Sequence, residues 1–377
     1  MKRIFSLLFP LIWLTGTSSL SAAGQPGPRS PETSKIQIAL LLDTSNSMDG
    51  LINQAKATLW DLVNEFTYVR CRESKTPLLE IALYEYGNDG LEAREGYIRQ
   101  VVPFTSDLDE LSAQLFGLKT NGGEEYCGQV IQTAMNQLGW SRRPGDLKMM
   151  FIAGNEPFNQ GRTAYETVMA QAHERDVVVN TIFCGDYHLG VRTLWADGAR
   201  LGKGEYTAID HNKAIVHIDT PYDDIIIRLN RELNKTYIGY GSRGAEKKRA
   251  QAVQDMNAME MEEGVMVARA VSKSSAFYSN SNWDLVDAYK DKKVDLESLE
   301  ADALPAELRD MDARALKSHL EALQSRRNAI QQEIVEANLQ REAFLAENRN
   351  ETGETLQQAL LEAVKKQAGS RGYHWIR

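Results

Sequence analysis

A buried strand that ends in a polar loop, directly before a helix, constrains this sequence more than any other stretch. Residues 36–42 are all apolar except Gln37, and residues 43–47 then read Asp-Thr-Ser-Asn-Ser. From residue 51 to residue 66 the apolar side chains follow helical spacing. An apolar run of this length is typical of a strand inside a parallel sheet. The order strand, loop, helix therefore places the polar loop at the carboxyl edge of a sheet, where ligands bind in α/β proteins.

Strand and helix patterns continue to alternate as far as residue 233. Strand patterns follow at 78–86, 97–102, 147–153, 177–183 and 206–209, the second of them as a possible edge strand. Helical patterns lie at 108–115, 125–138, 164–175, 192–201 and 223–233. This alternation predicts an α/β fold with a doubly wound, mostly parallel sheet covered by helices on both faces.

The loop after the first strand offers oxygen ligands at alternate positions. Asp43 contributes a carboxylate, and Ser45 and Ser47 contribute hydroxyls. These are hard donors that suit Mg²⁺, which takes few protein ligands and keeps several waters. The alternative is that the same residues only cap the helix that follows.

The pattern Asp43-x-Ser45-x-Ser47 resembles the metal-ion-dependent adhesion site of von Willebrand factor type A domains. The resemblance covers about residues 35–240 and implies their Rossmann-like fold. It also implies a divalent cation, Mg²⁺ or another, with one coordination position that a carboxylate from a partner protein fills. Under this interpretation all three residues are metal ligands.

The family also supplies a ligand from a second loop, usually a Thr after a pair of glycines. In this sequence Thr120 precedes Gly122 and Gly123, and Glu124 follows them. The resemblance to an acidic variant of this loop favours Glu124 as the metal ligand, with Thr120 as the second choice. Alternatively, Glu124 and Glu125 are acidic residues in the first turn of a helix, where the helix dipole favours them.

The third loop departs from the family pattern. The family has an Asp at the end of the middle strand, and Gly154 stands at that position here. Asn155 and Glu156 offer oxygen donors next to it. The departure implies an altered ligand set, or a weak or vestigial metal site.

The N-terminus reads as a secretory signal. Lys2 and Arg3 precede the apolar run 4–14, and Ser21-Ala22-Ala23 resembles a cleavage site. The run is short for a membrane span, although an uncleaved anchor is the alternative. We expect residues 1–23 to be a signal peptide, residues 24–34 to be a linker, and the protein to be exported to the periplasm.

Two function classes have little support. The formal charge of −9 argues against non-specific binding to nucleic acid. The sequence has no phosphate-binding P-loop, no His-Glu-x-x-His and no Gly-x-Ser-x-Gly, so we expect no enzyme. A Mg²⁺-dependent hydrolase is a lesser alternative, because a bound metal can activate water.

Three cysteines are too few for a disulfide framework. Cys71 is expected on the face opposite the other two. Cys127 and Cys184 are expected on the metal side, where they form either a disulfide or two buried free thiols.

After residue 240 strand patterns vanish, and residues 241–377 are expected to form a helical domain. Helical patterns cover 246–276, 282–288, 304–349 and 354–368. The third has a coiled-coil seam that Arg327 interrupts, formed by Leu316, Leu320, Leu323, Ile330, Ile334 and Ala337. We expect this helix and the last one to form an antiparallel hairpin, with the seam against Leu356, Leu360 and Val364, in a monomeric protein.

Together these observations predict an exported protein that binds a protein partner through a metal-ion-dependent site. The alternative from another class is a metal-free structural scaffold whose helical domain oligomerises.

Overall fold

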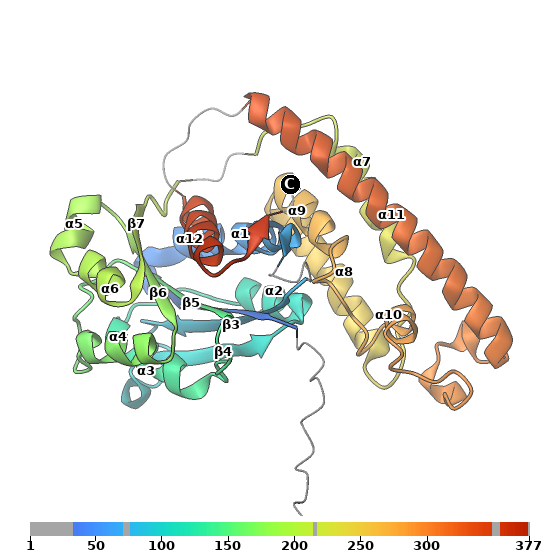
Figure 1. The fold of residues 1–377 in the computed structure, drawn as a ribbon, viewed down its shortest axis with the longest axis horizontal. Coiled ribbons are helices and arrows are strands. Elements are labelled where there is room, and N and C mark those ends of the chain that lie inside the picture. The colour runs from blue at the N-terminus through green and yellow to red at the C-terminus, as the bar shows by residue number, and fades with distance from the viewer. Residues whose placement is uncertain (1–32, 71–75, 214–216, 349–354, 376–377) are drawn as a thin grey trace, which may run out of the picture. The chain divides into compact units, whose positions relative to one another are not determined.

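The computed structural model describes residues 33–70, 76–213, 217–348 and 355–375 (Figure 1). The expected signal peptide at residues 1–23 and Cys71 lie outside these residues. None of the helices within them is both long and apolar enough to cross a membrane.

A six-stranded sheet in the order β4-β3-β1-β5-β6-β7 forms the centre of the fold. Only the edge strand β4 runs antiparallel to its neighbour. This confirms the predicted mostly parallel sheet with an edge strand near residue 97. The strands are β1 (Lys35–Asp43), β3 (Leu78–Tyr86), β4 (Ile98–Thr105), β5 (Leu147–Gly154), β6 (Val178–Cys184) and β7 (Lys203–Ile209).

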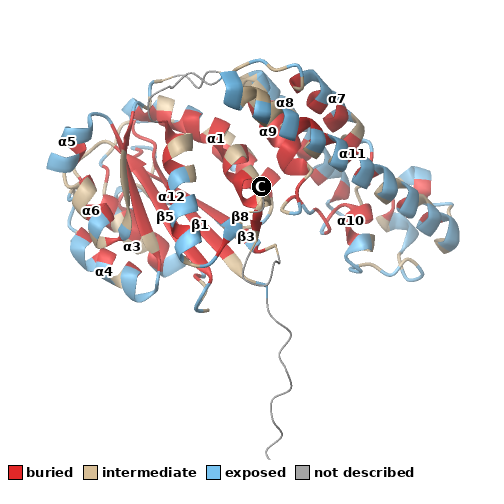
Figure 2. Ribbon diagram, turned by 45° about the horizontal axis from the view of Figure 1, so that its top comes forward, coloured by how far each residue is buried: buried red, intermediate tan, exposed pale blue. Residues whose placement is uncertain are grey.

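Helices cover both faces of the sheet, as the alternating patterns predicted. The side chains of β1 alternate between two apolar cores: Ile38 and Leu40 face one, and Ala39 and Leu41 face the other. Figure 2 shows the inner strands β1, β5 and β6 as almost entirely buried between these helices. The sheet-domain helices are α1 (Asp49–Thr67), α2 (Leu108–Phe116), α3 (Cys127–Gln137), α4 (Tyr165–Glu174), α5 (Tyr187–Arg192) and α6 (Trp195–Leu201), with the 3₁₀ turns η1 (Asn46–Met48) and η2 (Ala93–Glu95).

The rest of the described chain consists of helices joined by loops, together with a short two-stranded ladder. The strands of this ladder are β2 (Val69–Arg70) and β8 (His374–Trp375). The helices are α7 (Asp223–Asn234), α8 (Gly244–Met261), α9 (Glu263–Lys273), α10 (Leu285–Lys290), α11 (Ala313–Asn348) and α12 (Leu356–Ser370), with the 3₁₀ turns η3 (Ala301–Ala303) and η4 (Ala306–Leu308).

The expected hairpin between the last two long helices is wrong. Helix α12 packs on the sheet against α1 and strands β5 to β7, whereas α11 packs against α7, α9 and α10 (Figure 1). Leu356 and Leu360 line the same apolar interior as Leu40 and Leu42 of β1. The sheet supplies a broader apolar surface than a single helix stripe, so α12 completes the sheet face.

The seam of α11 is buried within the chain, but against other helices. Leu316 and Leu320 pack with Leu285, Val286 and Leu304. Arg327, which interrupts the apolar seam, is only 2% exposed. Its guanidinium contacts Asp284 and Asp287 at 2.7 Å each and lies 4.0 Å from the ring of Tyr237. Arg327 therefore closes a buried ionic cluster.

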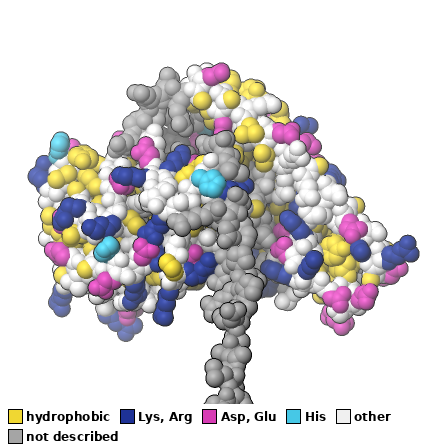
Figure 3. Space-filling view, viewed as in Figure 1, with side chains coloured by type: hydrophobic (Ala, Val, Ile, Leu, Met, Phe, Trp, Pro, Cys, Tyr) yellow, Lys and Arg dark blue, Asp and Glu magenta, His cyan; other side chains and the backbone are white. Residues whose placement is uncertain are grey.

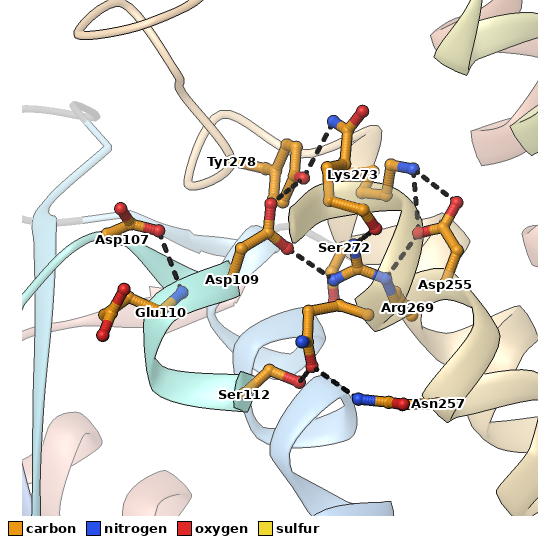
Figure 4. A network of polar contacts seen from close by, with 12 residues as sticks. Asp107, Asp109, Glu110, Ser112, Asp255, Asn257, Arg269, Ser272, Lys273 and Tyr278 are labelled. Atoms are coloured by element: carbon orange, nitrogen blue, oxygen red, sulfur yellow. Dashed lines mark hydrogen bonds and ion pairs between the residues drawn. The ribbon is translucent and has the colours of Figure 1, made fainter. Parts of the chain in front are cut away.

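A second buried ionic cluster joins the sheet domain to the helical part (Figure 4). Arg269 of α9 contacts Asp109 of α2 at 2.8 Å and Asp255 of α8 at 2.6 Å. Lys273 contacts Asp255 at 3.0 Å, and the Tyr278 hydroxyl donates to Asp109 at 2.6 Å. Helices from before and after residue 240, where we expected a domain boundary, are therefore packed directly against each other.

Candidate metal site

The polar loop after β1 encloses oxygen atoms that lack partners. Asp43 is 0% exposed, and its Oδ1 accepts a hydrogen bond from the Ser45 backbone N–H at 2.7 Å. The Asp43 Oδ2 and Ser45 Oγ atoms are buried and make no hydrogen bond of normal geometry with any described residue. Buried polar atoms are usually paired, so this pair of oxygens requires an explanation.

Glu125, not Glu124, joins Asp43. Glu125 is buried, and a Cβ placed on Gly87 would lie 2.7 Å from Glu125 Cγ and 3.0 Å from Asp43 Oδ1. Gly87 also has a φ of +77°, so only glycine lets the backbone come this close to both side chains. The end of β3 thus holds the two carboxylates together.

The two expected second-loop ligands lie elsewhere. Glu124 is exposed, and one of its oxygens accepts a hydrogen bond from Gln160 Nε2 at 3.3 Å. The Thr120 hydroxyl donates to the carboxylate of Asp49 at the start of α1. The helix begins at Cys127, so the backbone turn before it presents the second glutamate to Asp43.

The third loop reaches the same site through Asn155. Its Nδ2 donates to Ser47 Oγ at 3.1 Å, and its backbone N–H faces the Asp43 carboxylate, whose pKa it lowers. Its own Oδ1 is buried and has no hydrogen-bond partner among the described residues. Ser47 is exposed, and this hydrogen bond holds it against the third loop, which follows β5.

Burial raises the pKa of both carboxylates at this site. Burial, with a further contribution from the charge of Glu156, raises the pKa of Asp43 to about 7 despite the opposing hydrogen bond from the Ser45 backbone N–H. Burial and the charges of Asp43 and Glu156 raise the pKa of Glu125 to about 7. A divalent cation between them would relieve both the burial of charge and the repulsion.

These donors fit a hard cation better than a soft one. No three His, Cys, Asp or Glu side chains gather as a metal site in the described part of the chain. Cys127 and Cys184 are buried free thiols, which excludes the disulfide alternative between them. A cation here would need the carboxylates and hydroxyls of the loop, the oxygen ligands that Mg²⁺ prefers.

The sequence did not predict three features of this site. Glu125 lies beside Asp43, the backbone at Gly87 comes close to both of these side chains, and the Tyr86 hydroxyl fills the space beside Gly154. Each depends on how separate loops meet, and adjacent glutamates before a helix look alike in sequence. The one available signal was Gly87, directly after β3, since a glycine at such a position often marks a close approach of other groups to the backbone.

Comparison with known families gives one match within the sheet domain. Residues 37–190 match the family model described as von Willebrand factor type A domain. A comparison with curated proteins gave no match.

Several solved structures resemble the chain at low identity. Proximal thread matrix protein 1 from the mussel byssus, solved with a zinc-occupied MIDAS motif, is 14% identical with a TM-score of 0.37; the match covers 48% of this chain and 43% of that protein. The conserved hypothetical protein BatB from Bacteroides thetaiotaomicron is 16% identical with a TM-score of 0.35, over 59% of this chain and 98% of that one. An aerotolerance-related membrane protein from Bacteroides fragilis is 16% identical with a TM-score of 0.31, over 47% and 93%.

Proposed function

We propose that this chain, which contains a von Willebrand factor type A domain at residues 37–190, binds a protein partner through a divalent cation held at Asp43. The observation that carries the proposal is the pair of buried, unpartnered oxygens, Asp43 Oδ2 and Ser45 Oγ, beside the buried Glu125. A cation is the simplest group that satisfies all three.

In this proposal Asp43, Ser45 and Glu125 hold the cation, and Ser47 marks the exposed side from which a partner approaches. A bound Mg²⁺ would supply a positive centre that a partner carboxylate can complete. Asn155 positions Ser47 through its hydrogen bond. We propose binding rather than catalysis, because the sequence has none of the catalytic motifs considered above.

Calorimetric titration of the purified protein with MgCl₂ and MnCl₂ tests the metal step. Asp43→Asn should abolish binding, and Glu125→Gln should weaken it at least about tenfold, the cost of roughly 1.4 kcal/mol. The matched control is Glu124→Gln, whose side chain faces Gln160 and should change the affinity less than about twofold. Absence of divalent binding by the wild type at millimolar concentration would overturn the proposal and favour the metal-free scaffold.

We further propose that the protein is exported, on the strength of Lys2, Arg3, the apolar run 4–14 and Ser21-Ala22-Ala23. N-terminal sequencing of protein recovered from the periplasm should begin at Gly24. Intact Met1 in a membrane fraction would point to an uncleaved anchor instead.

A further inference from the structure

Helix α5 carries an exposed apolar surface at the carboxyl edge of the sheet, the edge that also holds Asp43. Three of its six residues are large, hydrophobic and exposed: Tyr187 at 53%, Leu189 at 41% and Val191 at 43%. Figure 3 shows hydrophobic side chains gathered over this helix. Tyr187 and Val191 are four residues apart and share one face of the helix, and neighbouring exposed apolar residues of this kind indicate an interaction site more than single ones do.

This surface is rigidly supported. Asp186 caps α5 by accepting a hydrogen bond from the Leu189 N–H at 2.8 Å. The Tyr206 hydroxyl of β7 donates to the Tyr187 carbonyl oxygen at 2.7 Å, and the two rings lie 5.1 Å apart. The exposed side chains therefore stand on a fixed scaffold, which lowers the entropy that binding would cost.

A cavity of about 580 Å³ adjoins the α5 surface. Its walls combine the aromatic ring of Tyr187 with apolar and polar groups. The lining residues are Gly185, Tyr187, Ala208, Ile209, Asp210, His211, Asn212 and Lys213. The volume is ample for one large side chain, and the mixed lining suits a ring with a polar tip.

The cavity wall rests on the helix that begins at the metal loop. A Cβ on Gly50, three residues after Ser47, would lie 2.2 Å from the His211 carbonyl oxygen. Gln54 Nε2 donates to the carbonyl oxygens of Asp210 at 2.9 Å and Lys213 at 3.1 Å. The cavity and the metal loop are thus fixed in relation to each other through the first turns of α1.

Strand geometry sets the separation of the two sites. Asp43 ends β1, whereas the cavity lies at the ends of β6 and β7, two and three strands along the sheet. At about 4.8 Å per strand, the separation is roughly 10–14 Å. An extended peptide rises about 3.3 Å per residue, so roughly three or four residues span that distance.

We infer that the partner binds as an extended segment with two anchors: an acidic residue on the cation at Asp43, and a Tyr or Trp three or four positions away in the cavity beside Tyr187. This inference rests on the proposed function and adds the recognition sequence. An aromatic anchor in a partly apolar pocket is the kind of residue that carries most of the energy of an interface. The exposed side chains of α5 offer further apolar contacts beside the aromatic anchor.

Selection from a displayed library of random dodecapeptides, with the full chain immobilised in MgCl₂, tests the inference. The wild type should enrich peptides that have Asp or Glu three or four positions from Tyr or Trp. Tyr187→Ala should retain the acidic enrichment and lose the spaced aromatic, and Tyr187→Phe should restore it. Met256→Ala is the matched control, since Met256 is 55% exposed on α8, and it should select the wild-type sequences.

A synthetic peptide taken from the wild-type selection then measures how much each anchor contributes to the affinity. Its affinity should fall about tenfold with Tyr187→Ala, and its binding should be lost in EDTA and with Asp43→Asn. Enrichment of acidic residues without a spaced aromatic, or enrichment that Tyr187→Ala leaves unchanged, would overturn the inference. The absence of any enrichment would also overturn the inference. Calorimetric titration with MgCl₂ then separates two cases: if the cation does not bind, the proposed function fails as well, and if it binds, only the inferred recognition sequence fails.

Discussion

The hydroxyl of Tyr86 occupies the space that a side chain on Gly154 would need. A Cβ placed on Gly154 would lie 2.5 Å from Tyr86 Oη and 3.0 Å from Asp43 Oδ2. The hydroxyl is fixed because it donates to the Ala153 carbonyl oxygen at 3.0 Å. Gly154 and the tyrosine at the end of β3 therefore share one buried space, which leaves no room for a side chain at position 154.

This packing makes Gly154→Ala destabilising. The added methyl group must displace the Tyr86 hydroxyl in a buried site, and overpacking of this kind costs about 1–3 kcal/mol of the free energy of unfolding. Tyr86→Phe in the same chain should recover part of the loss, so the two changes should be non-additive in urea denaturation. Gly139→Ala, where a Cβ meets nothing within 4 Å, is the control. Purely additive effects would contradict the shared-space explanation.

The stability of the metal-free protein should fall between about pH 4 and pH 7. The folded-state pKa values of Asp43 and Glu125, both about 7, lie above their ordinary values of 3.8 and 4.5. The folded state therefore retains protons that the unfolded chain has released, and the stabilisation present below pH 4 is lost as pH rises through 7. Urea denaturation in EDTA at pH 5, 6, 7 and 8 measures this, with Asp43→Asn as the variant that should flatten the profile. If MgCl₂ binds as proposed, it should restore stability mostly above pH 7.

Replacing Arg327 should destabilise the helical part strongly. Arg327→Ala leaves Asp284 buried at 0% exposure without its counter-charge, a change that costs about 3–5 kcal/mol. The adjacent Arg326 pairs with Glu232 on the surface, so Arg326→Ala should cost less than about 1 kcal/mol. Thermal and urea denaturation of the two variants should separate them clearly. Equal effects would mean that the buried cluster adds nothing beyond a surface pair.

The position of α12 on the sheet predicts that its apolar side chains stabilise the sheet domain. Leu360→Ala removes a side chain that is 4% exposed beside Leu40 and Leu42, and should cost about 2–5 kcal/mol. Glu362→Ala, two residues along on the exposed side of α12, should cost less than about 0.5 kcal/mol. Urea denaturation followed by tryptophan fluorescence, to which Trp60 in the same core contributes, reports the loss. A negligible change with Leu360→Ala would contradict this packing.

Local patterns were sufficient for most of the sheet domain. The apolar run 36–42 and the helical spacing after it predicted β1 and α1, and the alternation along the chain predicted the mostly parallel order. The helix expected at 192–201 begins only at Trp195, because Leu194 takes a left-handed backbone with φ of +73°, and the short helix α5 before it was not predicted. The long helix expected from residue 304 begins at Ala313, after two 3₁₀ turns.

The sequence alone determined the sheet, its helices and the loop that carries Asp43, Ser45 and Ser47, because apolar periodicity records which side of each element is buried. Only the tertiary structure decided that Glu125 rather than Glu124 lies beside Asp43, and that Tyr86 fills the space at Gly154. It also decided that α12 packs on the sheet rather than against α11. Periodicity shows that a stripe must be buried but does not name the surface that buries it. That choice depends on which surfaces, distant in the chain, fit together in three dimensions.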